Sequence, residues 1–276
     1  MTAATGAPRE PQAVHPEHAA LQRELRSWFT NSAPALGYVV ATQWYGYLSA
    51  PGGVVGTRLI LTVEDPGEVA RALDDARRRS GGTLTVWVDD RARCGRLDRA
   101  LQDAGCRPIK SVSHLALVGE LAARSGPPGL ELHDVGPDGL EEWVVTKLKC
   151  FGDTEAMPPA EQIAAETAVR APEMALATLQ LARLEGVPVA ALAYYAGTDQ
   201  LVFNLGTRVP FRHRGIAQQL LARWAAAGRA QGCRSLMINA DHLGRPEALY
   251  KKMGFVDEIY WYQRYGCDPD RVRSAD

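Results

Sequence analysis

The stretch LGTRVPFRHRGIAQQLLARW, residues 205–224, places a basic turn directly before an amphipathic helix. The N–H groups of a first helical turn lack intrahelical acceptors, and with the positive end of the helix dipole they form a site for phosphate or pyrophosphate. Gly215 lets an anion approach the main chain, Ala217 keeps the floor of the site small, and Arg212 and Arg214 add charge-assisted donors. The spacing therefore predicts an anion site, with an ordinary helix start carrying solvated arginines as the alternative.

The elements around this turn predict a mixed α/β sheet. In order they are a strand at 130–135, helices at 138–150 and 160–169, strands at 176–184, 188–196 and 200–207, the turn with its helix, a strand at 235–240, a short helix ending in ALYKKMGF and a strand at 258–265. The short connections EGVP and GTD predict that the three central strands are antiparallel neighbours.

The preceding part of the chain predicts a second α/β unit. It has a helix at 17–29, strands at 54–63, 83–88 and 111–118, and helices at 65–79 and 97–104. The stretch RSGPPG at 124–129 marks the boundary, so we predict a disordered tail at 1–16 and domains at 17–124 and 125–276. A weak internal repeat aligns Gly105 with Gly254 and places Leu101 where the second unit has Tyr250.

Composition narrows the class of protein. The 31 basic and 32 acidic residues nearly cancel, which argues against a nucleic-acid partner. No apolar run approaches the roughly 20 residues of a membrane span, and the N-terminus lacks the basic and apolar regions of a secretory signal, so we expect no membrane partner and a cytoplasmic location. The 5 cysteines are widely and irregularly spaced, which predicts reduced thiols and no metal site.

The central turn resembles the acetyl-coenzyme A signature of the GNAT superfamily of N-acetyltransferases, Gln/Arg-x-x-Gly-x-Gly/Ala, with Arg212, Gly215 and Ala217 at the three positions. A second resemblance lies in EALYKKMGF, where Tyr250, Gly254 and Phe255 match the family's Leu-Tyr-x-x-x-Gly-Phe ending. The likeness covers about 130–265. It implies a tandem arrangement of two GNAT-like domains, of which the N-terminal one is degenerate because nothing in it resembles the turn.

The resemblance implies a set of cofactor contacts to acetyl-CoA. The strand before the turn holds the pantetheine arm, and the turn holds the pyrophosphate. The residues at these positions are Leu205, Thr207 and Val209 on the strand side and Arg212, His213, Arg214, Gly215, Ile216, Ala217 and Gln218 in the turn.

The resemblance also implies an activity, the direct transfer of an acyl group from the CoA thioester to an amine of a small molecule or peptide. Tyr250 is the expected general acid for the departing thiolate. Glu155 is the candidate base, with an ordinary solvated acid as the alternative, and Asn204 is a candidate for orienting the acceptor or the carbonyl. Asp153 and Glu166 are further carboxylates in reach, and a chain of waters can replace a single base.

Two rival functions stay open at this stage. The protein could be a non-catalytic acyl-CoA sensor or interaction protein that keeps the turn without the chemistry. It could instead be an acyltransferase that uses a longer acyl-CoA or an acyl carrier protein, with contacts around Arg208, Arg212 and Arg214. The sequence specifies neither the acceptor nor the oligomeric state, for which monomer and homodimer are both compatible.

Overall fold

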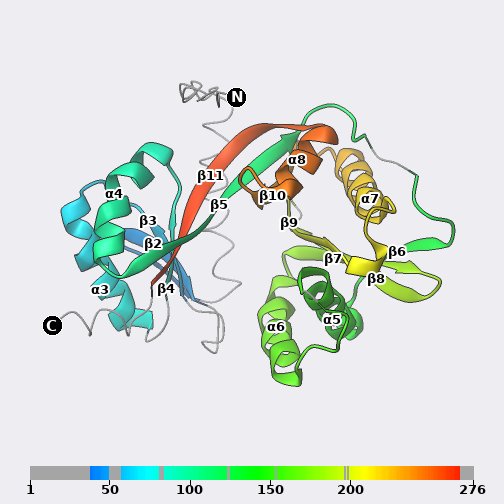
Figure 1. The fold of residues 1–276 in the computed structure, drawn as a ribbon, viewed down its shortest axis with the longest axis horizontal. Helices are drawn as coiled ribbons and strands as arrows, with labels where there is room; N and C mark the ends of the chain where they lie inside the picture. Colours follow the sequence, from blue (N-terminus) through cyan, green and yellow to red (C-terminus); the bar gives the residue numbers. More distant parts are fainter. Residues whose placement is uncertain are drawn as a thin grey trace, which may run out of the picture.

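The computed structural model describes residues 38–49, 57–80, 84–122, 125–152, 154–195, 197 and 199–267. The helix predicted at 17–29 and the tail predicted at 1–16 lie outside these residues. The described chain forms one 11-stranded sheet in the order β1-β2-β3-β4-β11-β5-β10-β9-β8-β7-β6, with helices packed on its faces (Figure 1). The prediction of a mixed α/β sheet is confirmed.

The N-terminal half, residues 38–122, has its helices α3 and α4 packed over a core with buried residues from β3, β4 and β11. Asp90 caps α4 by accepting a hydrogen bond from the Arg93 N–H at 2.6 Å, which explains why this helix begins earlier than the predicted 97. Leu101 of α4 is fully buried in the core beneath it. The elements are β1 (Tyr38–Ala41), β2 (Tyr45–Ser49), β3 (Thr57–Leu61), η1 (Pro66–Glu68), α3 (Val69–Ser80), β4 (Leu84–Val88), α4 (Arg91–Asp103) and β5 (Cys106–Leu117).

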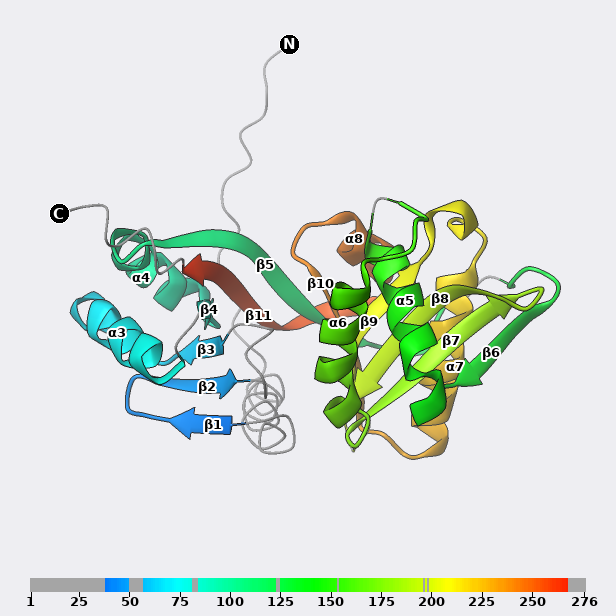
Figure 2. The ribbon, with the colours of Figure 1, turned by 90° about the horizontal axis from the view of Figure 1, so that it is seen from below.

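The C-terminal half, residues 125–267, has helices on both faces of its sheet. α5 and α6 cover one face, and α7 and α8 pack against the other (Figures 1 and 2). β7, β8 and β9 are antiparallel neighbours, which confirms the prediction from their short connections. The elements are β6 (Leu130–Asp134), η2 (Pro137–Gly139), α5 (Leu140–Phe151), α6 (Ala160–Glu173), β7 (Ala177–Leu184), β8 (Val187–Tyr195), β9 (Asp199–Thr207), η3 (Val209–Phe211), α7 (Ile216–Ala230), β10 (Ser235–Asp241), α8 (Arg245–Lys252) and β11 (Phe255–Cys267).

The two halves exchange their long last strands. β5 leaves the N-terminal half and pairs with β10, while β11 returns from the C-terminal half and lies between β4 and β5 (Figure 2). Each long strand follows a helix and a glycine with positive φ, 82° at Gly105 and 105° at Gly254, as the aligned repeat suggests. The division into domains at 17–124 and 125–276 stays a prediction. β5 belongs to the first of these domains, but its neighbours in the sheet, β10 and β11, both belong to the second.

A disulfide joins the two exchanged strands. Cys106 and Cys267 are directly opposite in the antiparallel pairing of β5 with β11, and their sulfur atoms are 1.97 Å apart. The prediction of reduced thiols is therefore wrong for this pair, because a spacing of 161 residues gives no hint that the two strands are neighbours. Cys94, Cys150 and Cys233 are free thiols. In the part of the chain described, no helix has the length and apolar character needed to cross a bilayer.

Candidate functional site

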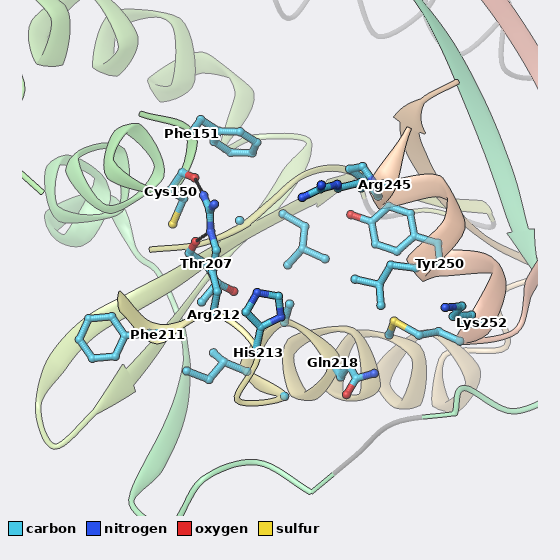
Figure 3. Close-up of a pocket in the computed structure, with 18 of the residues that line it drawn as sticks. Cys150, Phe151, Thr207, Phe211, Arg212, His213, Gln218, Arg245, Tyr250 and Lys252 are labelled. Carbon is cyan, nitrogen blue, oxygen red and sulfur yellow. Dashed lines mark hydrogen bonds between the residues drawn. The ribbon is translucent and has the colours of Figure 1, made fainter. Parts of the chain in front are cut away.

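A cavity of about 890 Å³ lies beside the carboxyl end of β9 (Figure 3). Its walls come from β9, the turn before α7, the first turn of α7, α8 and the end of α5. Next to the cavity the sheet opens, because β9 and β10 pair over only part of their length. β9 and β10 pair in parallel only from Asp199 with Ser235 to Val202 with Ile238, although β9 continues to Thr207. Main chain at the end of β9 therefore faces the cavity instead of a neighbouring β10 strand.

The structure brings most of the predicted site residues together around this cavity. The residues of the predicted set that line it are Leu205, Thr207, Arg212, His213, Gly215, Ile216, Ala217, Gln218 and Tyr250. Val209, Arg214, Asn204 and Glu155 are not among the lining residues.

The turn before α7 has two left-handed residues, one of which the sequence did not reveal. Gly215 caps α7 with a φ of 80°, and His213 has a φ of 64°, which is uncommon for a residue with a side chain. No side chain caps the start of α7, so the N–H groups of its first turn have no side-chain acceptor from a capping residue. Together with the helix dipole, this geometry suits a phosphate group of a ligand in the cavity.

The arginine side chains of the turn donate hydrogen bonds to main-chain carbonyls. Arg212 Nε donates to the carbonyl of Thr207 at 3.0 Å, and its Nη2 donates to the carbonyl of Cys150, also at 3.0 Å (Figure 3). Arg214 donates to the carbonyl of Pro210 at 3.2 Å, and its guanidinium lies 5.6 Å from the centre of the Phe211 ring. Arg212 thus connects β9 to the end of α5, a role that the spacing of the motif did not predict.

The end of α5 closes tightly onto β9 at a glycine. A Cβ on Gly206 would lie 2.5 Å from the Cβ of Cys150 and 3.3 Å from the Phe151 ring, so a side chain there would collide with α5. Burial raises the pKa of the Cys150 thiol to about 12, which keeps it protonated and argues against a thiolate nucleophile at this wall. Sequence reasoning missed Cys150 and Phe151 as lining residues, since their approach depends on the tertiary packing at Gly206.

Tyr250 reaches the cavity from α8. Its side chain is largely buried, with 7% of its surface exposed, and its hydroxyl points into the cavity (Figure 3). Burial raises the pKa of this phenol above its usual range, and the nearby carboxylate of Asp241 raises it further. The group is therefore a protonated donor at neutral pH and cannot serve as a base there.

The candidate carboxylates are engaged in ion pairs. Glu155 accepts a hydrogen bond from Arg208 Nε at 2.8 Å, and Arg208 also donates to the carbonyl of Pro188 at 2.6 Å. Glu166 pairs with Lys147 and Arg170, each at 2.7 Å, and these cations lower the pKa of its carboxyl against the effect of burial. Asp153 lies outside the described residues.

Asn204 lies on the opposite face of the sheet from α7. It pairs across the strands with Ala193, which belongs to the core beneath α5, so both side chains share that face. A register shift between Ala193 and Tyr194 marks a bulge in β9 at this point. Asn204 is therefore next to the split between β9 and β10, but on the side away from the lined cavity.

α8 contributes cavity residues that the sequence analysis did not single out. They are Arg245, Pro246, Leu249, Lys252 and Met253, in addition to Tyr250. Their spacing of three, four and seven residues places them on one face of a helix, and this signal could have found them once Tyr250 was assigned to the site.

Comparisons with known proteins agree with this geometry. Residues 177–257, from β7 into the start of β11, match the family described as Acetyltransferase (GNAT) domain. No curated protein matches the sequence.

Solved structures share the fold over most of the chain. A GCN5-related N-acetyltransferase from Kribbella flavida is similar with a TM-score of 0.66 and 18% identity, covering 92% of this chain and 98% of the other. One from Sphaerobacter thermophilus gives 0.54 and 18%, covering 88% and 84%. A tandem GNAT protein from the clavulanic acid biosynthesis pathway gives 0.55 and 16%, covering 83% and 81%.

The matched segment contains β9, the glycine turn, α7 and α8, which are the elements that build most of the cavity. Residues 177–257 of the chain therefore match the GNAT domain model, and they lie in a mixed α/β fold that resembles the folds of GNAT proteins, including a tandem one.

Proposed function

We propose that the protein is an N-acetyltransferase that moves the acetyl group of acetyl-CoA directly onto an amine of a small molecule or peptide. The observation that supports this most is the meeting of two features in one cavity. The Gly215 turn offers main-chain donors for phosphate, and the Tyr250 hydroxyl points into the same space from α8.

The cavity fits the donor at both ends. The N–H groups at the start of α7 would hold the pyrophosphate. The carboxyl end of β9, which is not paired with β10 beyond Val202, would align the extended pantetheine arm through its main chain, as an added strand does. Arg212 would keep this strand end and the end of α5 at a fixed separation.

Tyr250 would act at the departing sulfur. Amine attack on the thioester carbonyl forms the amide bond and breaks the C–S bond, and the departing thiolate takes the phenolic proton of Tyr250. The raised pKa of Tyr250 keeps this proton in place at neutral pH. The proton lost by the amine would pass to solvent through water, because Glu155 and Glu166 are held in ion pairs.

The N-terminal half would support the catalytic half. Its strand β5 closes the sheet beside β10, and its counterpart of Tyr250 is the fully buried Leu101. We therefore assign no catalysis to this half.

Tyr250→Phe tests the proposal against the sensor alternative. Binding of acetyl-CoA is measured by calorimetry, and turnover is measured as thiol release with a panel of amines. We expect the variant to keep the affinity of the wild type and to lose about 10²–10⁴-fold in kcat, the usual contribution of a general acid. Tyr265→Phe is the control, because that hydroxyl bonds Asp98 in the core of the N-terminal half.

Three outcomes would contradict the proposal in different ways. Absence of acetyl-CoA binding by the wild type removes the donor site. Binding without turnover for any amine supports the sensor. Full turnover in Tyr250→Phe removes the general acid while leaving acyl transfer intact.

A further inference from the structure

The helix that carries Tyr250, α8, is only 8 residues long, and a tight turn sets where it begins. This turn, residues 241–244, connects β10 to α8, and Leu243 in it has a φ of 57°, which is uncommon for a residue with a side chain. Such a conformation persists only where surrounding contacts hold it. The position of the Tyr250 hydroxyl therefore depends on the contacts that hold this turn.

Glu247, one helical turn before Tyr250, makes the first of these contacts. Its side chain is buried, and it accepts a hydrogen bond from the Leu243 N–H at 2.7 Å. Burial by itself would raise the pKa of this carboxyl, but the hydrogen bonds from Lys251 and from the Leu243 N–H outweigh it and hold the pKa below its usual range. Glu247 is thus an ionised group inside the protein that ties the turn to α8.

His242 joins the same turn to two strands of the sheet. Its Nδ1 lies 2.7 Å from the hydroxyl of Ser113 on β5, 3.2 Å from the carboxylate of Glu258 on β11 and 3.4 Å from that of Glu247. Ser113 is fully buried and donates its one hydroxyl hydrogen to Glu258 at 2.6 Å, so its oxygen can only accept from His242. Nδ1 therefore carries a hydrogen, and three oxygen acceptors surround it.

The other side of the imidazole faces the N-terminal half. Arg91, the first residue of α4, has its Nη1 3.4 Å from His242 Nε2, and because a guanidinium has donors only, Nε2 is the acceptor. Arg91 Nη2 also pairs with Glu258, and its guanidinium lies 4.5 Å from the centre of the Trp261 ring. These partners fix His242 as the neutral tautomer with its hydrogen on Nδ1.

We call Arg91, Ser113, His242, Glu247 and Glu258 the α8 anchor. Its members come from α4, β5, the turn before α8, α8 itself and β11, so it includes both of the strands that the two halves exchange. None of the five lines the cavity. The anchor can therefore act on a reaction there only through the position of α8, which packs against β10 and β11 (Figure 1). Such an effect can be large, because a displacement of about 1 Å can cost about 10²-fold in rate.

We propose that the α8 anchor positions Tyr250 at the sulfur of the donor, so that Arg91 of the N-terminal half raises the rate of acyl transfer without touching either substrate. This inference rests on the proposed function. Arg91 and Ser113 hold His242 and Glu258, these hold the turn, and the turn sets the start of α8. The members of the anchor are thus positioning residues, and Tyr250 is the group that acts on the donor.

The test measures kcat as thiol release from acetyl-CoA with the amine that the wild type acetylates fastest, and affinity for acetyl-CoA by calorimetry. We expect His242→Leu to lower kcat by about 10–100-fold and to change the affinity by less than about threefold, since the α7 turn is untouched. His242→Asn, whose amide can donate from the place of Nδ1, should restore kcat to within about fivefold of the wild type.

Arg91→Gln tests the contribution of the N-terminal half. Arg91 is half-exposed, so its replacement should leave the fold intact, and we expect kcat to fall by about 3–10-fold. Arg99→Gln is the matched control on the same helix. Arg99 is exposed and pairs with Asp103 of α4, so this variant should keep the wild-type kcat.

A double-mutant cycle with Tyr250→Phe shows whether the anchor acts through that hydroxyl. In the Tyr250→Phe background, His242→Leu and Arg91→Gln should each change the remaining turnover by less than about twofold, because the group that they position is gone. A general loss of folded protein would instead lower turnover by the same factor in both backgrounds.

The outcomes separate this inference from the proposed function. Wild-type kcat in His242→Leu and Arg91→Gln, with a loss in Tyr250→Phe, overturns the anchor and leaves the general acid in place. Equal losses in the two backgrounds also overturn it, because these residues would then act on something other than Tyr250. If His242→Leu does not fold, Arg91→Gln decides alone. Absence of turnover by the wild type with every amine overturns both proposals.

Discussion

The contact between Gly206 and α5 gives the sharpest prediction for the site. In Gly206→Ala the new Cβ would lie 2.5 Å from the Cβ of Cys150, about 1 Å inside the ordinary contact distance between carbon atoms. The end of α5 would have to move away, but Arg212 holds it through the carbonyl of Cys150 at 3.0 Å. The substitution therefore either overpacks this wall or breaks that hydrogen bond.

The cost follows from these two terms. Overpacking of a core costs about 1–3 kcal/mol, and loss of a hydrogen bond to a charged group costs about 1.5–3 kcal/mol. Because the wall avoids one of these costs only by accepting the other, we expect Gly206→Ala to lower the free energy of unfolding by about 1–3 kcal/mol. Urea unfolding followed by tryptophan fluorescence measures this value.

A control and a double-mutant cycle make the prediction refutable. Gly46→Ala on β2 meets nothing within 4 Å and should change the free energy of unfolding by less than about 1 kcal/mol. Cys150→Gly removes the colliding Cβ, so the effect of Gly206→Ala should shrink by at least about 1 kcal/mol in that background. If Gly206→Ala behaves like Gly46→Ala, or if the cycle shows no coupling, the reasoning about this wall is wrong.

Three further predictions concern stability. Burial lowers the pKa of His114 to about 3, below its value near 6.5 in the unfolded chain. The stability that neutral His114 allows above pH 6.5 should therefore be lost as the pH falls toward 3. In His114→Asn the plot of unfolding free energy against pH should be less steep by up to about 1.4 kcal/mol per pH unit. Removal of the disulfide with Cys106→Ser/Cys267→Ser should cost about 2–5 kcal/mol, and a reductant should destabilise the wild type but not this variant, as calorimetry in its presence and absence would reveal. A fragment of residues 125–276 loses β5, the partner of both β10 and β11, and should be insoluble on expression; a soluble fragment with acetyl-CoA affinity would refute the supporting role of the N-terminal half.

Local patterns predicted the elements of the site well because their causes are local. The glycine turn, the apolar face of α7 and the short connections of the β7–β9 meander depend on residues within a few positions of each other, and the structure has these elements within a few residues of the predicted bounds. The predicted start of α4 is six positions too late because its first six residues, RARCGR, include no large apolar side chain, although Asp90 is a regular capping residue.

Features that depend on distant segments could not be read in the same way. The hydrogen bond from Arg212 to the Cys150 carbonyl joins residues 62 positions apart. The spacing of the motif could therefore place the arginine at the turn but could not predict which group its side chain contacts. The disulfide has the same origin, since Cys106 and Cys267 become neighbours only after β11 enters the sheet beside β5. The ion pair of Glu155 with Arg208 likewise joins the loop after α5 to the end of β9 and is invisible in a one-dimensional pattern.

The exchange of β5 and β11 bears on how the chain can be made. During synthesis the N-terminal half emerges first, yet β4 meets its neighbour β11 only after residue 267 has left the ribosome. Until then one side of β4 and, before β10 is made, both sides of β5 expose unpaired backbone groups, which are templates for pairing with other chains. The nascent protein therefore has to keep these edges apart from other chains for nearly its entire period of translation, and a premature stop shortly before β11 would leave both halves unfinished at once.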